Sequence, residues 1–184
     1  MARTTRTDWL EEGLAILRQG GEAALTVEKL CANLERTKGS FYHHFKDAGA
    51  YLDSLLEHWE AKNTSAPIQA ATAGSTAVER RHRLNESVRV LDMKLEVAVR
   101  AWALRDERAE RALRRVDARR IDYLAELYTL MHGKGPVARQ LAEVEYAAFV
   151  GMQQLFPDLS ARRYRALYAV LERALELVAK DQRG

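Results

Sequence analysis

Residues 25–47 read LTVEKLCANLERTKGSFYHHFKD, and this stretch decides the fold. Its first half spaces apolar side chains three and four residues apart after the capping residue Thr26, which predicts a short amphipathic helix. The inner face of that helix would be Val27, Leu30, Cys31 and Leu34. Thr37 is a second N-cap, and a helix from there to about His44 would bury Phe41 and Phe45. Two short helices joined by a tight turn are the pattern of a helix-turn-helix.

The outer side of the second helix carries groups that suit DNA. Ammonium, hydroxyl and imidazole groups contact phosphates and base edges. The side chains on this face are Lys38, Ser40, Tyr42, His43 and His44. His43 and His44 could instead form a metal pair, but adjacent residues point in different directions on a helix and no cysteine or carboxylate stands nearby at ligand spacing. DNA contact is therefore the favoured interpretation, and exposure of Tyr42 is predicted.

Two further helices flank this pair. The first is predicted to begin at Thr7 or Asp8 and to end at Gly20-Gly21. Asp47 is a good N-cap for a fourth helix, whose apolar stripe is Leu52, Leu55, Leu56 and Trp59. We therefore expect a three-helix DNA-binding domain over residues 1–47 and a larger domain over residues 48–184, joined by a linking helix at 48–63.

The remaining sequence is also predicted to be helical. Residues 64–76 are small and unpatterned, which predicts a loop. Apolar periodicity beyond this loop predicts helices at about 77–91, 93–104, 106–131 and 136–155, and a final one from after Pro157 to about 180. The expected fold class is all-α with about nine helices.

The last two predicted helices have more apolar surface than one chain can cover. Residues 146–152, YAAFVGM, are apolar nearly all round. The final helix has an apolar stripe from Tyr164 to Val178, and Val170 and Leu177 lie outside that stripe. This surplus predicts a homodimer in which the last two helices of each chain form a four-helix interface. The alternative is burial inside a monomer.

The overall charge is too small to argue for DNA by itself. The 184 residues carry 29 basic and 26 acidic side chains, a formal net charge of +3. A local patch can still contact phosphates. Arg36, Lys38 and Lys46 lie in a window without an acid, and Arg3 and Arg6 lie near the amino terminus.

The cysteine content and the length of the apolar runs indicate in which cellular compartment the protein is expected. Cys31 is the single cysteine, so an intrachain disulfide is impossible, which fits a reducing cytosol. A buried, inert thiol is favoured over a redox sensor. The chain starts without a signal peptide pattern, and its longest apolar run is too short to cross a bilayer. We expect a cytoplasmic protein without a membrane partner.

The segment from Leu30 to Phe45 resembles the helix-turn-helix signature of TetR-type transcriptional repressors. The resemblance is strong over residues 7–60, and beyond them only the helical layout agrees. It implies that two threonines cap their helices and bond phosphate, that the start of the second helix enters the major groove, and that the following aromatic residues reach phosphate, base or groove edge. The resemblance and the basic window at 36–46, which adds Arg36 and Lys46, together give the predicted DNA-binding residues: Thr26, Arg36, Thr37, Lys38, Gly39, Ser40, Tyr42, His43, His44 and Lys46.

The chain departs from the family pattern at two positions. Glu35 stands in the turn where the family usually has glycine, and a non-glycine residue in a left-handed turn costs roughly 1 kcal/mol. Ala48 stands near the start of the fourth helix where the family usually has lysine. One phosphate contact is lost there, and Lys46 could replace it.

The resemblance also implies small, often apolar ligands between the helices of the larger domain. The candidate ligand-binding residues are Trp59, Trp102, Tyr123, Tyr146 and Phe149, and the alternative is that they are ordinary core aromatics. Arg119 and Arg120 interrupt the apolar stripe of the long helix. For these arginines, a solvated charge run is favoured over an inward-facing side chain.

Taken with the resemblance, these patterns predict a ligand-responsive transcriptional regulator, a repressor. It would bind a palindromic DNA operator as a homodimer and be released by a small apolar effector. One alternative is a DNA-binding regulator controlled by a protein partner without a small-molecule pocket. Another is an all-α enzyme, which is disfavoured because the sequence has no nucleophile–base pairing, no metal-ligand spacing and no phosphate loop. No cofactor is expected.

Overall fold

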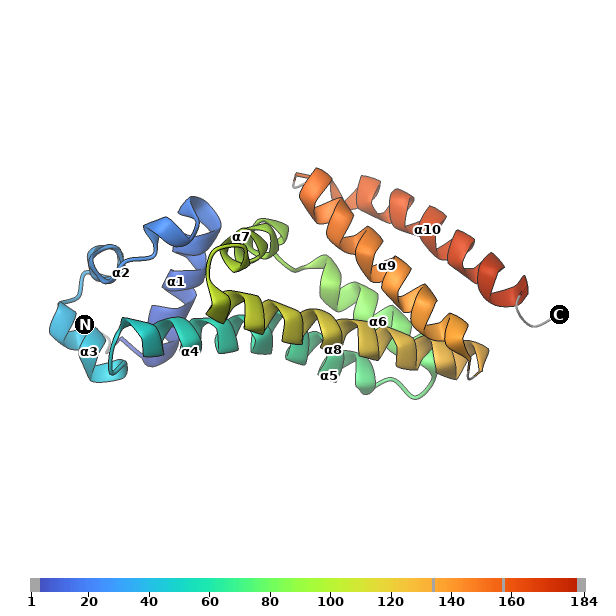
Figure 1. The fold of residues 1–184 in the computed structure, drawn as a ribbon, viewed down its shortest axis with the longest axis horizontal. Coiled ribbons are helices and arrows are strands. Elements are labelled where there is room, and N and C mark those ends of the chain that lie inside the picture. The colour runs from blue at the N-terminus through green and yellow to red at the C-terminus, as the bar shows by residue number, and fades with distance from the viewer. Residues whose placement is uncertain (1–3, 134, 157, 182–184) are drawn as a thin grey trace. The chain divides into compact units, whose positions relative to one another are not determined.

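The computed structural model describes residues 4–133, 135–156 and 158–181, and within them the chain is helical and has no strand (Figure 1). The predicted all-α fold class is confirmed. The helices are α1 Arg6–Gly20, α2 Val27–Leu34, α3 Lys38–His44, α4 Ala48–Glu60, α5 Ala66–Thr72, α6 Ala77–Arg89, α7 Met93–Ala103, α8 Glu107–His132, α9 Pro136–Leu155 and α10 Ala161–Asp181. A 3₁₀ turn spans Glu22–Ala24, and a π-helical segment, Ala61–Ser65, follows α4.

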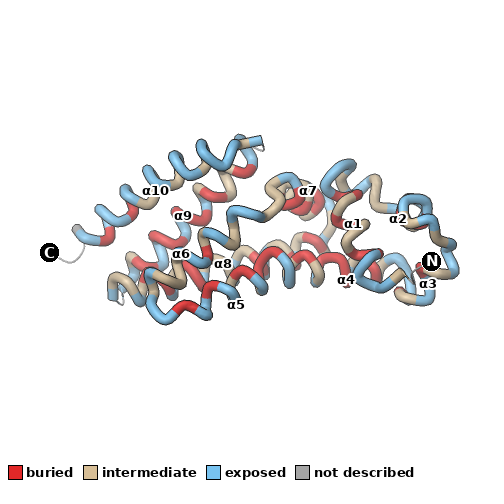
Figure 2. The backbone as a smooth tube through the Cα atoms, turned by 180° about the vertical axis from the view of Figure 1, so that it is seen from behind, coloured by how far each residue is buried: buried red, intermediate tan, exposed pale blue. Residues whose placement is uncertain are grey.

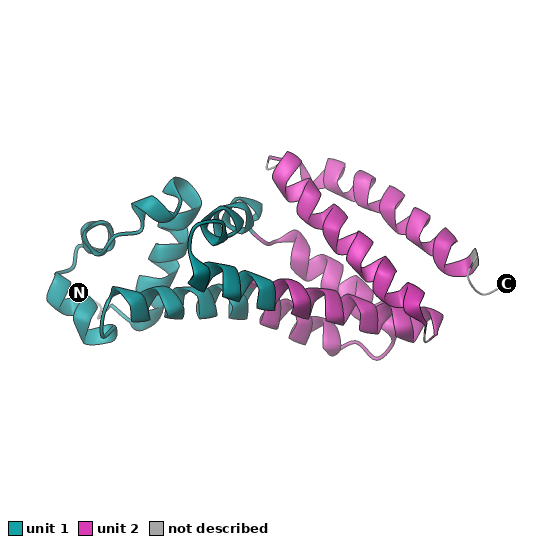
Figure 3. Ribbon diagram, viewed as in Figure 1, with its two compact units in different colours: residues 1–62, 92–115 teal, residues 63–91, 116–184 magenta. Residues whose placement is uncertain are grey.

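The chain forms two compact units (Figure 3). Unit 1 comprises residues 1–62 and 92–115, and unit 2 comprises residues 63–91 and 116–184. Unit 1 therefore holds α1 to α4, α7 and the start of α8. Unit 2 holds α5, α6, the rest of α8, α9 and α10. The predicted domain boundary at residue 47 stays a prediction.

The core of unit 1 fixes α3 against α1 and α4. Trp9 and Phe41 are fully buried, and their ring centroids lie 5.5 Å apart in an edge-to-face arrangement. The Tyr51 hydroxyl donates to the Trp9 carbonyl oxygen over 3.0 Å. Gly13 leaves room for this contact, because a Cβ there would lie 1.9 Å from the Tyr51 hydroxyl oxygen. Cys31 is also buried, and burial raises the pKa of its thiol, as expected of an inert cysteine.

The predicted start of the first helix is wrong by about two residues. Thr5 is the N-cap: its hydroxyl oxygen accepts from the Asp8 backbone N–H over 3.2 Å. The Asp8 carboxylate in turn accepts from the Thr5 backbone N–H over 2.7 Å. Asp8 thus fills the acidic position of a capping box rather than the cap itself.

The predicted loop at 64–76 is also wrong for most of its length. The π-helical segment leads directly into α5, and irregular chain is confined to the short connection before α6. Alanine is the best helix former and Pro67 lies in the first turn, where proline is tolerated, so helix forms without an amphipathic pattern. Ala71 is fully buried, and its small side chain lets α5 pack closely on α6.

Helix α10 buries little of itself (Figure 2). Between residues 161 and 180 only Leu175 and Ala179 are buried. Its exposed large apolar side chains are Leu167, Val170, Leu177 and Val178. Helix α9 adds Val144, which is also exposed. The isolated chain therefore leaves an apolar outer face on α10 open to solvent.

Candidate functional site

The turn between α2 and α3 is left-handed at Glu35, so the departure from the family pattern does not change the type of turn. Glu35 has φ 53° and ψ 48°, and it is the single non-glycine residue with positive φ in the described part of the chain. The Arg36 N–H donates to the Cys31 carbonyl oxygen over 2.9 Å and closes the turn. The glutamate is therefore accommodated in a conformation that favours glycine.

Replacing Glu35 by Gly should raise the free energy of unfolding by about 1 kcal/mol, because glycine adopts this conformation without a Cβ clash. Urea denaturation followed by circular dichroism measures the difference. Glu35→Ala is the control, since it removes the carboxylate and keeps the strain. Equal stability of the two variants would contradict the explanation.

Both helices of this pair are capped as expected. The Thr26 hydroxyl oxygen accepts from the Lys29 N–H over 3.1 Å, and that of Thr37 accepts from the Ser40 N–H over 3.2 Å. Each threonine uses its oxygen as an acceptor, so its hydroxyl hydrogen can still be donated to a phosphate. The two capping predictions are confirmed.

Helix α3 has one buried face, which packs against the rest of unit 1, and one exposed face. Phe41 and Phe45 are buried, whereas Tyr42 is 51% exposed, as predicted from its place between them. Lys38, Gly39 and His43 of this helix are exposed, and so is Lys46 just beyond it. Ser40 and His44 are half-buried, with the His44 ring 6.5 Å from that of Trp9. The polar groups of α3 are thus held outward by its two phenylalanines.

Three basic side chains near α3, those of Lys38, Arg36 and Arg6, already have partners within unit 1. Lys38 forms an ion pair with Glu28, which raises the pKa of Lys38. Arg36 Nε donates to the Thr4 hydroxyl over 2.6 Å. Arg6 donates to the Ser54 hydroxyl over 2.6 Å and covers the Phe45 ring, so it packs against the domain. Arg3 lies outside the described residues.

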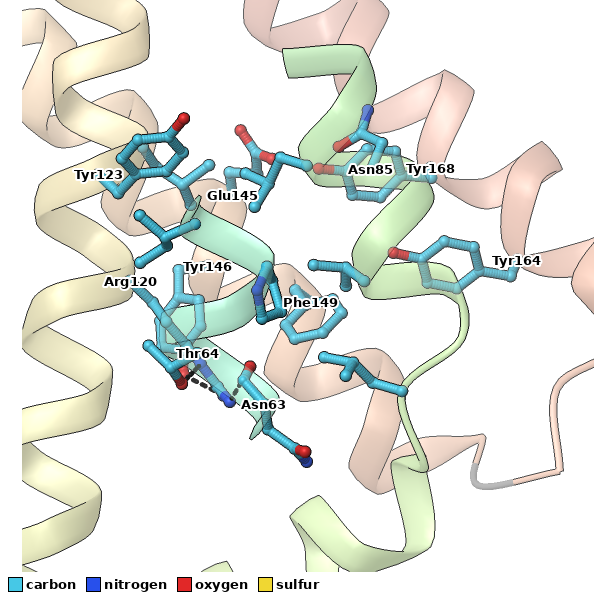
Figure 4. Close-up of a pocket in the computed structure, with 16 residues that line it drawn as sticks. Asn63, Thr64, Asn85, Arg120, Tyr123, Glu145, Tyr146, Phe149, Tyr164 and Tyr168 are labelled. Carbon is cyan, nitrogen blue, oxygen red and sulfur yellow. Dashed lines mark hydrogen bonds between the residues drawn. The ribbon is translucent and has the colours of Figure 1, made fainter. Parts of the chain in front are cut away.

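Unit 2 encloses a cavity of about 60 Å³ (Figure 4). Aliphatic residues of α5, α6 and α8 line it together with aromatic residues of α8, α9 and α10. The apolar and aromatic lining residues are Pro67, Ile68, Leu84, Val88, Leu91, Tyr123, Leu124, Tyr146, Phe149, Tyr164 and Tyr168. Polar groups are gathered at two ends of this lining, as the view in Figure 4 shows.

At one end, Arg120 holds the π-helical segment. Its guanidinium donates to the Thr64 hydroxyl over 2.9 Å and to the Asn63 carbonyl oxygen over 3.1 Å. It also donates to the Tyr146 hydroxyl over 3.2 Å, and Tyr146 donates to Asp117 over 2.6 Å. Arg120 therefore joins α8 to α9 and to the start of unit 2.

At the other end, a buried carboxylate joins four helices. Glu145 of α9 is 2% exposed and accepts from Arg81 of α6 over 2.6 Å and from Tyr128 of α8 over 2.7 Å. It also accepts from the Tyr168 hydroxyl of α10. Burial raises the pKa of both tyrosines, which keeps them as neutral donors. The carboxylate is thus neutralised and hydrogen-bonded where water is excluded.

Comparison with solved structures decides the fold. The chain is 22% identical, with a TM-score of 0.72, to the crystal structure of a transcriptional regulator described as a TetR/AcrR family member; the match covers 94% of this chain and 95% of that one. It is 23% identical, with a TM-score of 0.68, to the crystal structure of the reduced form of E. coli NemR; the match covers 95% of this chain and 96% of that one. The chain has the TetR-type fold. No protein-family model and no curated protein matches its sequence.

The cavity of this TetR-type fold includes three of the five predicted aromatic residues. Tyr123, Tyr146 and Phe149 line it. Trp59 and Trp102 do not, because both are buried in unit 1, where Trp59 Nε1 donates to Glu96 over 2.9 Å. An aromatic residue in an apolar stripe looks the same in the sequence whether it fills a core or lines a hollow.

The sequence interpretation missed several lining residues. A solvated Arg120 was favoured, and that was wrong; its neighbour Arg119 is exposed and donates to the Ser65 hydroxyl over 2.7 Å. Tyr164 and Tyr168 were assigned only to the apolar stripe of the last helix. Glu145 carried a usable signal, because a carboxylate within an apolar stretch implies a buried partner. That partner, Arg81, is distant in sequence.

Among the residues that the structure describes, no group of three or more histidine, cysteine, aspartate or glutamate side chains is placed to hold a metal ion. No described helix is long and apolar enough to cross a membrane.

Proposed function

We propose that this protein is a ligand-responsive transcriptional regulator, a repressor, that binds a palindromic operator as a homodimer in the cytoplasm. The observation that carries the proposal is the open face of α3. It presents Lys38, Tyr42 and His43 to solvent, while Phe41 and Phe45 of the same helix are buried, in a helix-turn-helix that resembles the TetR-type signature. These side chains suit phosphates and base edges.

The apolar outer face of α10 supports the dimer. A second copy packed on it would cover Val170, Leu177 and Val178, which are exposed in the single chain. Two recognition helices related by a two-fold axis would then enter successive major grooves, roughly 34–36 Å apart. Such a dimer requires an operator with two-fold symmetry.

The cavity of unit 2 supports control by a small molecule. A regulator controlled through a protein partner needs no internal space, and the cavity therefore favours the small-molecule alternative. The ligand would weaken DNA binding only through a higher affinity for a conformation that does not fit the operator.

Selection from a pool of random duplexes at fixed salt concentration tests the proposal. The full chain should retain duplexes that share a palindromic motif. A chain with Tyr42→Ala and His43→Ala should lose this motif and keep only weak, salt-sensitive binding. Because both side chains are exposed, the variant should fold normally. Recovery of random sequences by the unchanged chain would refute the proposal.

A further inference from the structure

The charged groups around the cavity already have partners. Two charged side chains line it, Arg120 at one end and Glu145 at the other. Glu145 is paired with Arg81 over 2.6 Å. Arg120 donates to oxygen atoms of Thr64, Asn63 and Tyr146, and the Tyr146 hydroxyl donates to Asp117. An ionic ligand would be desolvated here and would have to displace one of these partners, which is costly. The lining therefore favours an uncharged ligand.

Two tyrosine hydroxyls on the lining are available as donors. Tyr164 of α10 directs its hydroxyl into the cavity, as Figure 4 shows. Burial raises the pKa of Tyr164 to about 12, so the hydroxyl stays protonated at neutral pH. The Tyr123 hydroxyl of α8 is buried and has no hydrogen-bond partner among the described residues. Donors without a partner on an apolar lining favour a ligand that brings an acceptor.

The volume of the cavity determines whether a ligand can enter without moving the lining. An apolar cavity of roughly 150 Å³ holds benzene, whereas this one measures about 60 Å³. A ring-sized ligand must therefore move part of the lining. The least enclosed wall is α10, where the rings of Tyr164 and Tyr168 stack with centroids 5.6 Å apart. Binding that displaces this wall selects a conformation other than the empty one, which is what a ligand-operated switch requires.

We propose that the cavity binds an uncharged, largely apolar molecule that carries a hydrogen-bond acceptor, and that Tyr164 donates to this acceptor. The inference rests on the proposed function, since it names the class of effector that the same cavity takes.

Four probes with one benzene ring separate the alternatives. Benzamide is uncharged and carries an acceptor, benzoate is an anion, benzylamine is a cation at neutral pH, and toluene has no acceptor. Dissociation constants for the full chain can be measured by ligand-observed NMR. Benzamide should bind at least about tenfold more tightly than each of the others. Equal or tighter binding of benzoate, benzylamine or toluene would overturn the inference, as would binding of no probe at millimolar concentration.

A single-atom change tests the role of Tyr164. Tyr164→Phe keeps the ring and removes the hydroxyl, so benzamide should bind roughly tenfold more weakly while toluene binds as before. Tyr42→Phe, on the exposed face of α3, is the matched control and should change neither affinity. Unchanged benzamide affinity in Tyr164→Phe, or equal losses for benzamide and toluene, would contradict the assignment.

Operator affinity is measured separately from ligand affinity. The proposed ligand class and the proposed release from the operator can therefore fail independently. If benzamide binds as expected and operator affinity stays unchanged at saturation, the ligand class stands and the switch in the proposed function fails. If benzoate or benzylamine binds more tightly and releases the operator, the switch stands and the ligand class fails.

Discussion

Replacing Glu145 by Ala should lower the free energy of unfolding by about 3–5 kcal/mol, the range expected when a buried ion pair loses one partner. The change leaves the Arg81 guanidinium without its carboxylate in a place where its side chain is 11% exposed. It also leaves the hydroxyls of Tyr128 and Tyr168 without their acceptor. Urea denaturation at one fixed protein concentration gives the value, because dimer stability depends on concentration.

A matched change on the same helix separates this effect from helix propensity. Glu143 lies on α9 in an exposed pair with Arg139, so Glu143→Ala should change stability by less than about 0.5 kcal/mol. A chain with both Arg81→Leu and Glu145→Leu should lose less stability than the two single changes added together, since neither charge is then buried alone. Additive losses would show that the pair does not act as a unit.

Replacing Val170 by Glu should convert the proposed dimer to monomers and weaken operator binding at least about 100-fold, because each monomer then binds one half-site alone. Val170 is 70% exposed in the single chain, so the monomer should tolerate the charge. A carboxylate buried in an apolar interface has no partner there, which disfavours association. Sedimentation velocity measures the assembly, and fluorescence anisotropy measures the affinity for a recovered operator.

The control for this change lies on the same helix. Arg165→Gln alters the charge by the same single unit at an exposed position on a different side of α10. It should leave the assembly dimeric. A Val170→Glu chain that sediments as a dimer would place the interface elsewhere on the molecule.

Local chemistry explains why the helix-turn-helix could be predicted from the sequence. Thr26 and Thr37 cap their helices through backbone groups three residues away, and Phe41 and Phe45 mark the buried side of α3 by spacing alone. The left-handed turn at Glu35 agrees with the family pattern, although the residue itself disfavours it and the sequence pointed to a different turn. Each of these features is set within a few residues of chain.

The cavity depends on packing between distant segments, and the sequence does not specify that packing locally. Arg81 and Glu145 are 64 residues apart, and nothing near either one identifies the other. Arg120 is turned inward by the Asn63 carbonyl oxygen and the Thr64 hydroxyl of the π-helical segment, where the sequence predicts that the linking helix ends and a loop begins. The stripe containing Tyr164 and Tyr168 indicated an apolar face correctly, but periodicity does not say whether a hollow lies beneath it.

Changing the spacing between the two half-sites of a recovered operator tests the central claim most directly. A dimer with two fixed recognition helices reads half-sites on one side of the duplex. Inserting about five base pairs, half a helical turn, would turn one half-site to the opposite side, so affinity should fall to that of a single half-site. An operator that binds equally well with and without the insertion would contradict the account, because the chain would then read each half-site alone.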